Sequence, residues 1–230
     1  MMTEATRGAP GRGRFITFEG GEGAGKSTQI KKLAERLEAA KVHVVLTREP
    51  GGSPGAEIIR HLVLSGMGKL LGPEAETLLF AAARDDHVRT VIAPALAQGS
   101  WVLCDRFYDS TRAYQVKLGQ VAPAVLDAMQ RVTIGDLKPD LTIILDLPVE
   151  VGLKRAAARR GAEAPDRFES EDLAFHQALR DAYREIATGE PQRCVLIDAN
   201  ADVDTVAGSV WAALHARFFA ESASIVAGTA

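Results

Sequence analysis

Cysteine, excess charge and long apolar runs are all scarce in this 230-residue sequence, and each shortage excludes a class of protein. The two cysteines, Cys104 and Cys194, stand far apart inside apolar runs and lack the spacing of metal ligands. We therefore expect buried thiols in a reducing compartment, which predicts a cytoplasmic protein. A net charge of −3 and a pI near 6.0 argue against a general nucleic-acid binder, so no nucleic-acid partner is expected.

The apolar runs are too short for a membrane protein, because none approaches the roughly 18 residues of a membrane helix. No membrane partner is therefore expected. The N-terminal sequence MMTEATRGAPGRGR is basic but lacks the apolar segment of a secretory signal. Residues 1–13 are predicted to be a flexible extension and residues 221–230 a flexible tail. Since no internal repeat or linker interrupts the rest, residues 14–220 are predicted to form a single domain.

Short runs rich in β-branched residues alternate with longer segments of helical spacing. The predicted strands are 15–18, 42–47, 101–104, 141–147 and 194–197. The predicted helices are 27–40, 54–65, 74–98, 122–134, 149–160, 170–187 and 202–219. Continuous apolar strands alternating with helices are typical of a parallel α/β sheet, buried on both faces and connected by right-handed crossovers.

A glycine-rich stretch, EGGEGAGKST, follows the first predicted strand and precedes the first predicted helix. It matches G-x-x-x-x-G-K-[ST], in which glycines let the backbone N–H groups turn toward phosphates. The lysine reaches the β- and γ-phosphates, and the serine hydroxyl binds Mg²⁺. The chain is therefore predicted to bind a nucleoside triphosphate through Gly20, Gly21, Glu22, Gly23, Ala24, Gly25, Lys26, Ser27 and Thr28.

Other phosphate-binding classes fit the sequence less well. No G-x-G-x-x-G can be drawn through these glycines, which excludes the dinucleotide motif, and no N-K-x-D string for guanine exists. Positions 21 and 22 are glycine and glutamate, where a partitioning-type ATPase has a second lysine.

Two predicted strands end in aspartate, at Asp105 and Asp146, and either could reach the nucleotide edge of the sheet. Asp105 is followed by Arg106, and a carboxylate for the metal beside a guanidinium for a phosphate suits phosphoryl transfer. Ser27 and Asp105 are therefore the predicted Mg²⁺ ligands. The alternative is a surface ion pair at a strand end. Asp146 precedes Leu147-Pro148, a helix-start signal, which favours a capping or structural role.

A set of motifs in fixed order resembles the bacterial thymidylate kinase family over about residues 14–200. The motifs are EGxEGAGKST, TREPGG (47–52), LLFAAAR (78–84), DRFYDSTRAYQ (105–115), PDLTIILD (139–146), VGLKR (151–155) and DRFE (166–169). The resemblance implies a P-loop nucleoside monophosphate kinase fold, with a parallel five-stranded sheet flanked by helices in three layers. It also implies a mobile lid at about residues 155–169, transfer of the ATP γ-phosphoryl to dTMP with Mg²⁺, and a homodimer.

The same resemblance implies a base and sugar subsite for dTMP. Thymine would stack on Phe80 and bond to Arg84, which share one helix face because they are four residues apart. Thr111 and Gln115 would line the base edge, and Tyr114 would lie under the deoxyribose. Packing in the core is the alternative for Phe80.

The phosphate side of the implied site is basic. Arg106 and Arg60 would hold the dTMP phosphate, and Glu22 would face the sugar and the lid. His61, His87 and His176 have no evident partner and are interpreted as structural or surface residues.

The catalytic arginine of this family comes from the phosphate loop or from the lid. The loop carries none, whereas the segment RRGAEAPDR and its flank contain Arg155, Arg159, Arg160 and Arg167. Arg159 matches the lid position best, Arg160 could replace it, and a solvated basic helix end is the alternative. The predicted catalytic residues are Lys26, Asp105, Arg106 and Arg159.

Two departures from the family pattern concern loops. VKLGQVAP follows AYQ where relatives often have a loop rich in glycine and arginine, and GAEAP slightly lengthens the lid. A kinase for another nucleotide and a non-enzymatic nucleotide-gated regulator are the rival interpretations.

Overall fold

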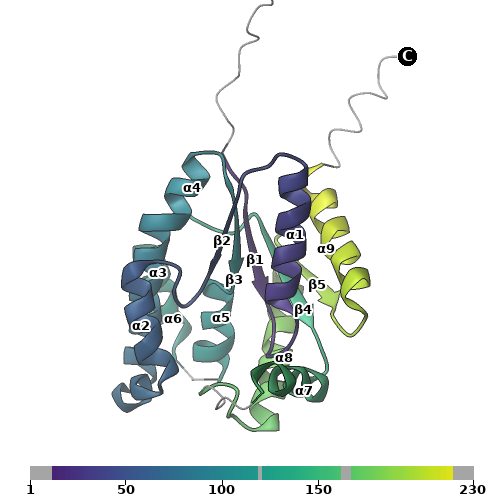
Figure 1. The fold of residues 1–230 in the computed structure, drawn as a ribbon. Helices are drawn as coiled ribbons and strands as arrows, with labels where there is room; N and C mark the ends of the chain where they lie inside the picture. Colours follow the sequence, from purple (N-terminus) through teal and green to yellow (C-terminus); the bar gives the residue numbers. More distant parts are fainter. Residues whose placement is uncertain (1–11, 119–120, 162–166, 220–230) are drawn as a thin grey trace, which may run out of the picture.

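A parallel five-stranded sheet forms the centre of the computed structural model, which describes residues 12–118, 121–161 and 167–219 (Figure 1). The strand order is β2-β3-β1-β4-β5, and every pairing is parallel. The strands are β1 (Phe15–Glu19), β2 (Val44–Arg48), β3 (Trp101–Asp105), β4 (Leu141–Asp146) and β5 (Cys194–Asp198). The five predicted strands and the α/β class are confirmed.

The helices follow the predicted segments closely. They are α1 (Lys26–Ala39), α2 (Pro54–Leu64), α3 (Pro73–His87), α4 (Ala93–Ala97), α5 (Tyr108–Thr111), α6 (Pro123–Thr133), α7 (Val149–Arg160), α8 (Leu173–Gly189) and α9 (Val203–Phe218). Shorter pieces are the 3₁₀ turn η1 (Met67–Leu71) and two π-helical turns, η2 (Val88–Ile92) and η3 (Arg112–Leu118). Because η2 joins α3 to α4 directly, the predicted helix 74–98 corresponds to these three consecutive pieces.

Helices cover both faces of the sheet and give three layers. Ile16 and Phe18 of β1 pack with α1 and α9 on one face, and Figure 1 shows those two helices side by side. Phe15, two residues before the central position of the same strand, packs on the other face with Ile92 and Phe107. This alternation explains why the strand reads as a continuous apolar run.

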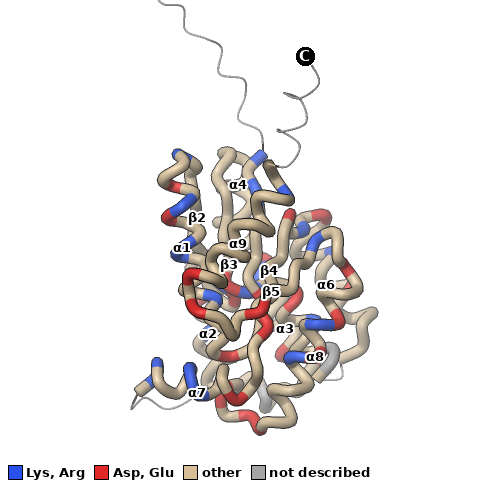
Figure 2. The backbone as a smooth tube through the Cα atoms, turned by 90° about the vertical axis from the view of Figure 1, so that its right-hand side faces the viewer, with Lys and Arg blue, Asp and Glu red and all other residues tan. Residues whose placement is uncertain are grey.

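The carboxyl ends of the parallel strands lie at one edge of the sheet, which is where ligands bind in such folds. Glu19, Asp105, Asp146 and Asp198 end four of the strands, and Glu49 directly follows the fifth. In Figure 2 basic and acidic positions are interspersed along the visible part of the chain. Within the described residues, no helix is long and apolar enough to cross a membrane.

The segment 108–118 was not predicted to be helical, yet it forms α5 and η3. Parts of three other predictions lie outside the described residues: the N-terminal extension up to residue 11, the C-terminal tail, and lid residues 162–166. Residues 12 and 13 of the extension are described. Arg12 pairs with Asp140, and the N–H of Gly13 donates to the Leu96 carbonyl.

Candidate active site

The phosphate loop connects β1 to α1 and packs closely on neighbouring backbone. Gly20 has φ +133° and Gly23 has φ +67°. A Cβ atom on Gly23 would lie 2.0 Å from the Gly152 carbonyl oxygen, and one on Gly20 would lie 2.5 Å from that of Leu145. Only glycine fits both the space and the dihedrals. The loop is thereby held against the end of β4 and the first turn of α7.

Lys26 begins α1 and curls back over the loop. Its ammonium group donates to the carbonyls of Gly20 (3.0 Å) and Gly21 (3.1 Å). Burial, followed by the nearby charge of Arg106, lowers the pKa of Lys26. The remaining predicted ATP-binding positions lie close to Lys26 in the sequence. Ala24 is buried in the core, Gly25 caps α1, and Thr28 is exposed in the first helical turn.

A cavity of about 410 Å³ opens beside the loop. Twelve of the predicted site residues line it: Glu22, Lys26, Ser27, Arg60, Phe80, Arg84, Asp105, Arg106, Thr111, Tyr114, Gln115 and Arg159. The structure therefore brings residues from the phosphate loop, α2, α3, β3, the α5–η3 segment and α7 around one space. Sequence reasoning did not identify other lining residues, among them Arg48, Glu49, Ser110, Phe168 and Glu169.

Ser27 and Asp105 meet at the loop side of this cavity. The Ser27 hydroxyl donates to Asp105 Oδ2 over 2.7 Å. A hydroxyl and a carboxylate are the oxygen ligands that Mg²⁺ takes when nucleotide phosphates supply the rest of its shell, so the pair fits this ion. No cluster of three or more His, Cys, Asp or Glu suited to a metal occurs among the residues the structure describes.

Arg106 is held from several sides. Its backbone has φ +68°, and its N–H donates to the Phe18 carbonyl at 2.9 Å. The guanidinium donates to Glu22 Oε1 at 2.7 Å and to the Tyr183 hydroxyl at 3.0 Å. It also lies over the Tyr114 ring, 5.3 Å from the ring centroid. Its ion-pair partner is thus Glu22 of the phosphate loop, and the side chain is only 15% exposed.

Glu22 carries its charge in this setting. Burial alone would raise its pKa, but Arg106 and then Lys26 outweigh that effect and lower the pKa below the usual value. The Tyr114 hydroxyl also reaches Glu22 Oε1, at 3.4 Å. A side chain of the phosphate loop therefore contacts the predicted grip on the acceptor phosphate directly.

Glu19 shares the partners Ser110 and Tyr183 with Arg106 and was missed by sequence reasoning. The carboxylate accepts from the Phe107 N–H (2.8 Å), the Ser110 hydroxyl (2.6 Å) and the Tyr183 hydroxyl (3.0 Å). Burial raises its pKa to about 7, with a smaller contribution from Asp109. A glutamate ending a buried strand was the available signal, but the partners come from segments far away in the sequence.

The opposite wall is formed by α3 and the α5–η3 segment. Phe80 is half-buried and lines the cavity. Arg84, one turn further, is buried: its Nε donates to Glu49 Oε2 at 2.7 Å and its Nη2 to the Thr111 hydroxyl at 3.1 Å. The Tyr114 ring packs edge-on against Phe168 at 5.1 Å. A flat ring and a guanidinium thus face the same space, as the four-residue spacing predicted.

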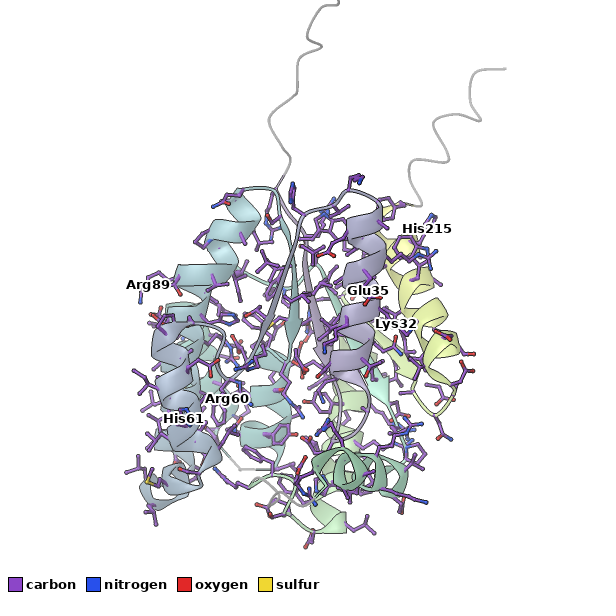
Figure 3. All side chains as sticks on the ribbon, viewed as in Figure 1. Lys32, Glu35, Arg60, His61, Arg89 and His215 are labelled. Atoms are coloured by element: carbon purple, nitrogen blue, oxygen red, sulfur yellow. The ribbon has the colours of Figure 1, made fainter. Side chains whose placement is uncertain are left out.

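Arg60 lies on the inner side of α2, toward the sheet, whereas Arg89 points outward (Figure 3). The Nη1 of Arg60 donates to the Pro50 carbonyl at 2.6 Å. This bond ties α2 to the loop after β2, and both elements line the cavity.

The four arginines around the predicted lid have different environments. Arg155 donates to the Ala199 carbonyl at 3.1 Å, and Arg167 pairs with Glu76. Arg159 and Arg160 both pair with Glu169, at 3.3 and 2.6 Å. Arg159 is the more exposed of these two, at 65% against 22%, and it lines the cavity.

The remaining polar residues singled out in the sequence have structural surroundings. Asp146 pairs with Arg180 and Arg184 of α8, both at 2.7 Å, which fits a structural role. His61 is exposed on α2 and His176 is buried in α8. His87 has partners that the sequence did not reveal: Glu49 at 3.1 Å and Thr47 at 2.6 Å.

Comparisons with known proteins agree with this arrangement. The family profile of Thymidylate kinase matches residues 18–210. A thymidylate kinase of Bradyrhizobium diazoefficiens is 75% identical over 226 residues, which cover 98% of this chain and 99% of the relative. One of Nitrobacter winogradskyi is 73% identical over 230 residues and 100% of both chains.

A solved structure is also similar along most of the chain. The crystal structure of thymidylate kinase from Ehrlichia chaffeensis has a TM-score of 0.72 and 34% identity, covering 89% of this chain and 100% of that one. Its fold is the one the motifs implied, a P-loop nucleoside monophosphate kinase sheet. By profile, by sequence and by structure, this chain belongs to the thymidylate kinase family.

Proposed function

We propose that the protein transfers the γ-phosphoryl of ATP to dTMP, giving ADP and dTDP. The observation that carries the proposal is the bridge between Glu22 of the phosphate loop and Arg106 of the acceptor wall, inside one cavity. The bridge supports the proposal because it joins the loop that would bind ATP to the arginine that would hold the dTMP phosphate. A nucleotide-gated regulator has no need of such a second basic wall.

On the donor side, the loop backbone and Lys26 would hold the ATP phosphates. Ser27 and Asp105 would hold Mg²⁺ with those phosphates, and their 2.7 Å contact supports this pairing. When bound, the ion neutralises charge on the β- and γ-phosphate oxygens.

On the acceptor side, Phe80 would stack on the thymine ring, with Arg84, Thr111 and Gln115 at its polar edge. Tyr114 would lie under the deoxyribose. Arg106 and Arg60 would hold the dTMP phosphate, and Glu22 would keep the Arg106 fork oriented before the substrate arrives. Fixed donors of this kind stabilise transferring phosphoryl charge because they need no reorganisation during the reaction.

We further propose that the lid, at about residues 155–169, closes over ATP and supplies Arg159 as the last positive charge. Its position on the cavity wall supports this role. So does its 3.3 Å contact with Glu169, because Arg159 is 65% exposed and Glu169 keeps Arg160 as a second partner at 2.6 Å. Closure would also exclude water from the phosphoryl group. Residues 1–11 and 221–230 stay predicted as segments outside the kinase domain, whereas Arg12 and Gly13 of the predicted extension contact the domain.

Substrate choice is the first prediction. The enzyme should use dTMP best, with dUMP weaker by roughly tenfold to 200-fold in kcat/KM, since one methyl group in an apolar pocket contributes about 1–3 kcal/mol. UMP, CMP, GMP and AMP should be poorer still. A coupled ADP-release assay across these six acceptors measures the order, with ADP release in the absence of any acceptor as the blank. Equal kcat/KM for dTMP and AMP would refute the assignment.

We also propose a homodimer formed through α2, η1 and α3. Among the residues that the structure describes, the exposed large apolar side chains concentrate there: Ile58, Met67, Leu70, Leu71 and Leu78. Ile58 is 74% exposed and Leu70 is 86% exposed. The three elements contact one another, and exposed apolar side chains gathered in one region mark an interaction surface.

Replacing Ile58 with glutamate should therefore convert a dimer into a monomer. A two-fold interface contains each substitution twice, so the variant would bury two carboxylates. Taking these charges out of water costs several kcal/mol. Sedimentation equilibrium should give twice 24.6 kDa for the natural chain and 24.6 kDa for the variant. Leu173→Glu, on α8 and 52% exposed, is the matched control and should leave the dimer intact. A natural chain that sediments as a monomer would overturn the proposal.

A cytoplasmic location is part of the same proposal. Cys104 and Cys194 are both buried free thiols, which a reducing compartment preserves.

A further inference from the structure

A chain of buried polar contacts runs behind the base side of the cavity, from His87 through Glu49 to Arg84. His87 ends α3, and its ring is fully buried. Its Nδ1 lies 3.1 Å from Glu49 Oε1, while Glu49 Oε2 accepts from Arg84 Nε at 2.7 Å. Arg84 Nη2 then donates to the Thr111 hydroxyl at 3.1 Å. Glu49 also lines the cavity, whereas His87 lies behind it and is not one of the lining residues.

The far side of the His87 ring is closed as well. Its Nε2 lies 2.6 Å from the Thr47 hydroxyl of β2. Gly52, with φ +85°, covers this pair so closely that a Cβ atom there would lie 2.4 Å from Thr47 Oγ1 and 2.6 Å from His87 Nε2. The ring therefore has one orientation. An ionised carboxylate has only acceptor oxygens, so the contact with Glu49 is a hydrogen bond in the tautomer that carries its proton on Nδ1.

This arrangement fixes both oxygens of Glu49 at once. A carboxylate bonded only to Arg84 could rotate about its last torsion and carry the guanidinium with it. With His87 holding Oε1, the remaining oxygen has a fixed direction, and so does the Arg84 fork. Arg84 and Glu49 are both buried, at 4% and 5% exposed side chain, so water cannot replace a missing bond at little cost.

We propose that His87 is a positioning residue for recognition of the acceptor base, acting through Glu49 on Arg84. The inference deepens the proposed function and rests on it, because Arg84 is the side chain assigned to the base.

Two substitutions of His87 distinguish the contribution of Nδ1 from that of Nε2. In His87→Asn the amide nitrogen takes the place of Nδ1 and keeps the donation to Glu49. In His87→Gln it takes the place of Nε2 and keeps only the Thr47 contact. Both variants lose the ring and one hydrogen bond, so a merely structural role predicts similar changes in Tm and in kinetics for the two.

The measurements are KM for dTMP, KM for ATP, kcat and Tm for the natural chain and both variants. We expect His87→Gln to raise the KM for dTMP about tenfold or more, because a bond to a charged group is lost. We expect His87→Asn to stay within about threefold of the natural value. KM for ATP should change little in either. Equal KM values for dTMP in the two variants, whether high or normal, would overturn the proposal.

Where His87→Gln does not fold, Thr47→Val and Glu49→Gln carry the same test. Thr47→Val removes only the Nε2 contact and should leave the KM for dTMP near its natural value, whereas Glu49→Gln should raise it about tenfold or more. The reverse order would overturn the proposal. Natural enzyme that does not turn over dTMP would instead refute the proposed function. A different result would refute this inference alone: the natural enzyme turns over dTMP normally and Arg84→Ala raises the KM for dTMP, but His87→Gln and His87→Asn have the same KM for dTMP.

Discussion

Replacing Arg106 with alanine should lower kcat/KM for dTMP by roughly 10³–10⁵. Removing one preorganised donor costs about 10²–10³ in the chemical step, and losing a charged hydrogen bond to the bound phosphate costs about another 10–100-fold. Both effects are expected because Arg106 would hold an oxygen of the acceptor phosphate before and during transfer. ATP affinity, measured by calorimetry without dTMP, should change little.

Two control variants decide whether this loss belongs to Arg106 itself. Removing the guanidinium leaves Glu22 without the partner it holds at 2.7 Å, and the stranded charge could repel the phosphates. The double variant Glu22→Gln, Arg106→Ala removes that charge and should not recover the activity. Arg106→Lys keeps the charge but not the fork, so it should recover only part of it. An alanine variant with unchanged kinetics would show that Arg106 is an ordinary ion pair.

Replacing Arg159 with alanine should lower kcat by roughly 10²–10⁴, by analogy with arginine fingers. Lys26 and a bound Mg²⁺ would reach only part of the transferring phosphoryl, and the phosphate loop has no arginine of its own. Because this contact would form only as the lid closes, equilibrium affinity for dTMP should change little. Single-turnover rates and calorimetric dTMP affinity, measured on the same preparations, separate the two effects.

Neighbouring arginines on α7 provide matched controls. Arg155 donates to the Ala199 carbonyl, so Arg155→Ala should have a much smaller effect on kcat. Arg160 is more tightly paired with Glu169 than Arg159 is, 2.6 against 3.3 Å, and Arg160→Ala should likewise leave most of the rate. If Arg160→Ala shows the large loss of kcat and Arg159→Ala does not, Arg160 rather than Arg159 is the catalytic arginine of the lid. Normal turnover by the double variant would contradict a lid arginine altogether.

The strands and the long helices could be predicted because both carry their periodicity in the local sequence. The strands are covered on both faces, so they read as unbroken apolar runs. The segment 108–118 could not be recognised as helical in the same way. Its polar residues Ser110, Thr111 and Gln115 face the cavity or Glu19, and part of it is π-helical, so the usual helical spacing is absent.

In the site, too, local features could be predicted and contacts between distant segments could not. The placement of motif residues such as Lys26 and Arg84 at the cavity could be predicted, because short spacings fix their relation to a helix or loop and the family resemblance indicated the site. The supporting contacts could not, since each joins distant segments: Glu19 meets Tyr183, and Glu49 meets His87. The interpretation of His87 as a residue without an evident partner followed from this limit, because its partner lies 38 positions away.

Transfer of labelled phosphoryl tests the central claim most directly. The protein is incubated with Mg²⁺, dTMP and ATP carrying a ³²P label in its γ-phosphoryl, and the nucleotides are separated by chromatography. We predict that the label moves into dTDP in an amount equal to the ADP formed, and that Arg106→Ala forms neither at a comparable rate. Label released as inorganic phosphate while dTMP stays unchanged would show a nucleotide hydrolase or regulator, and would contradict the account.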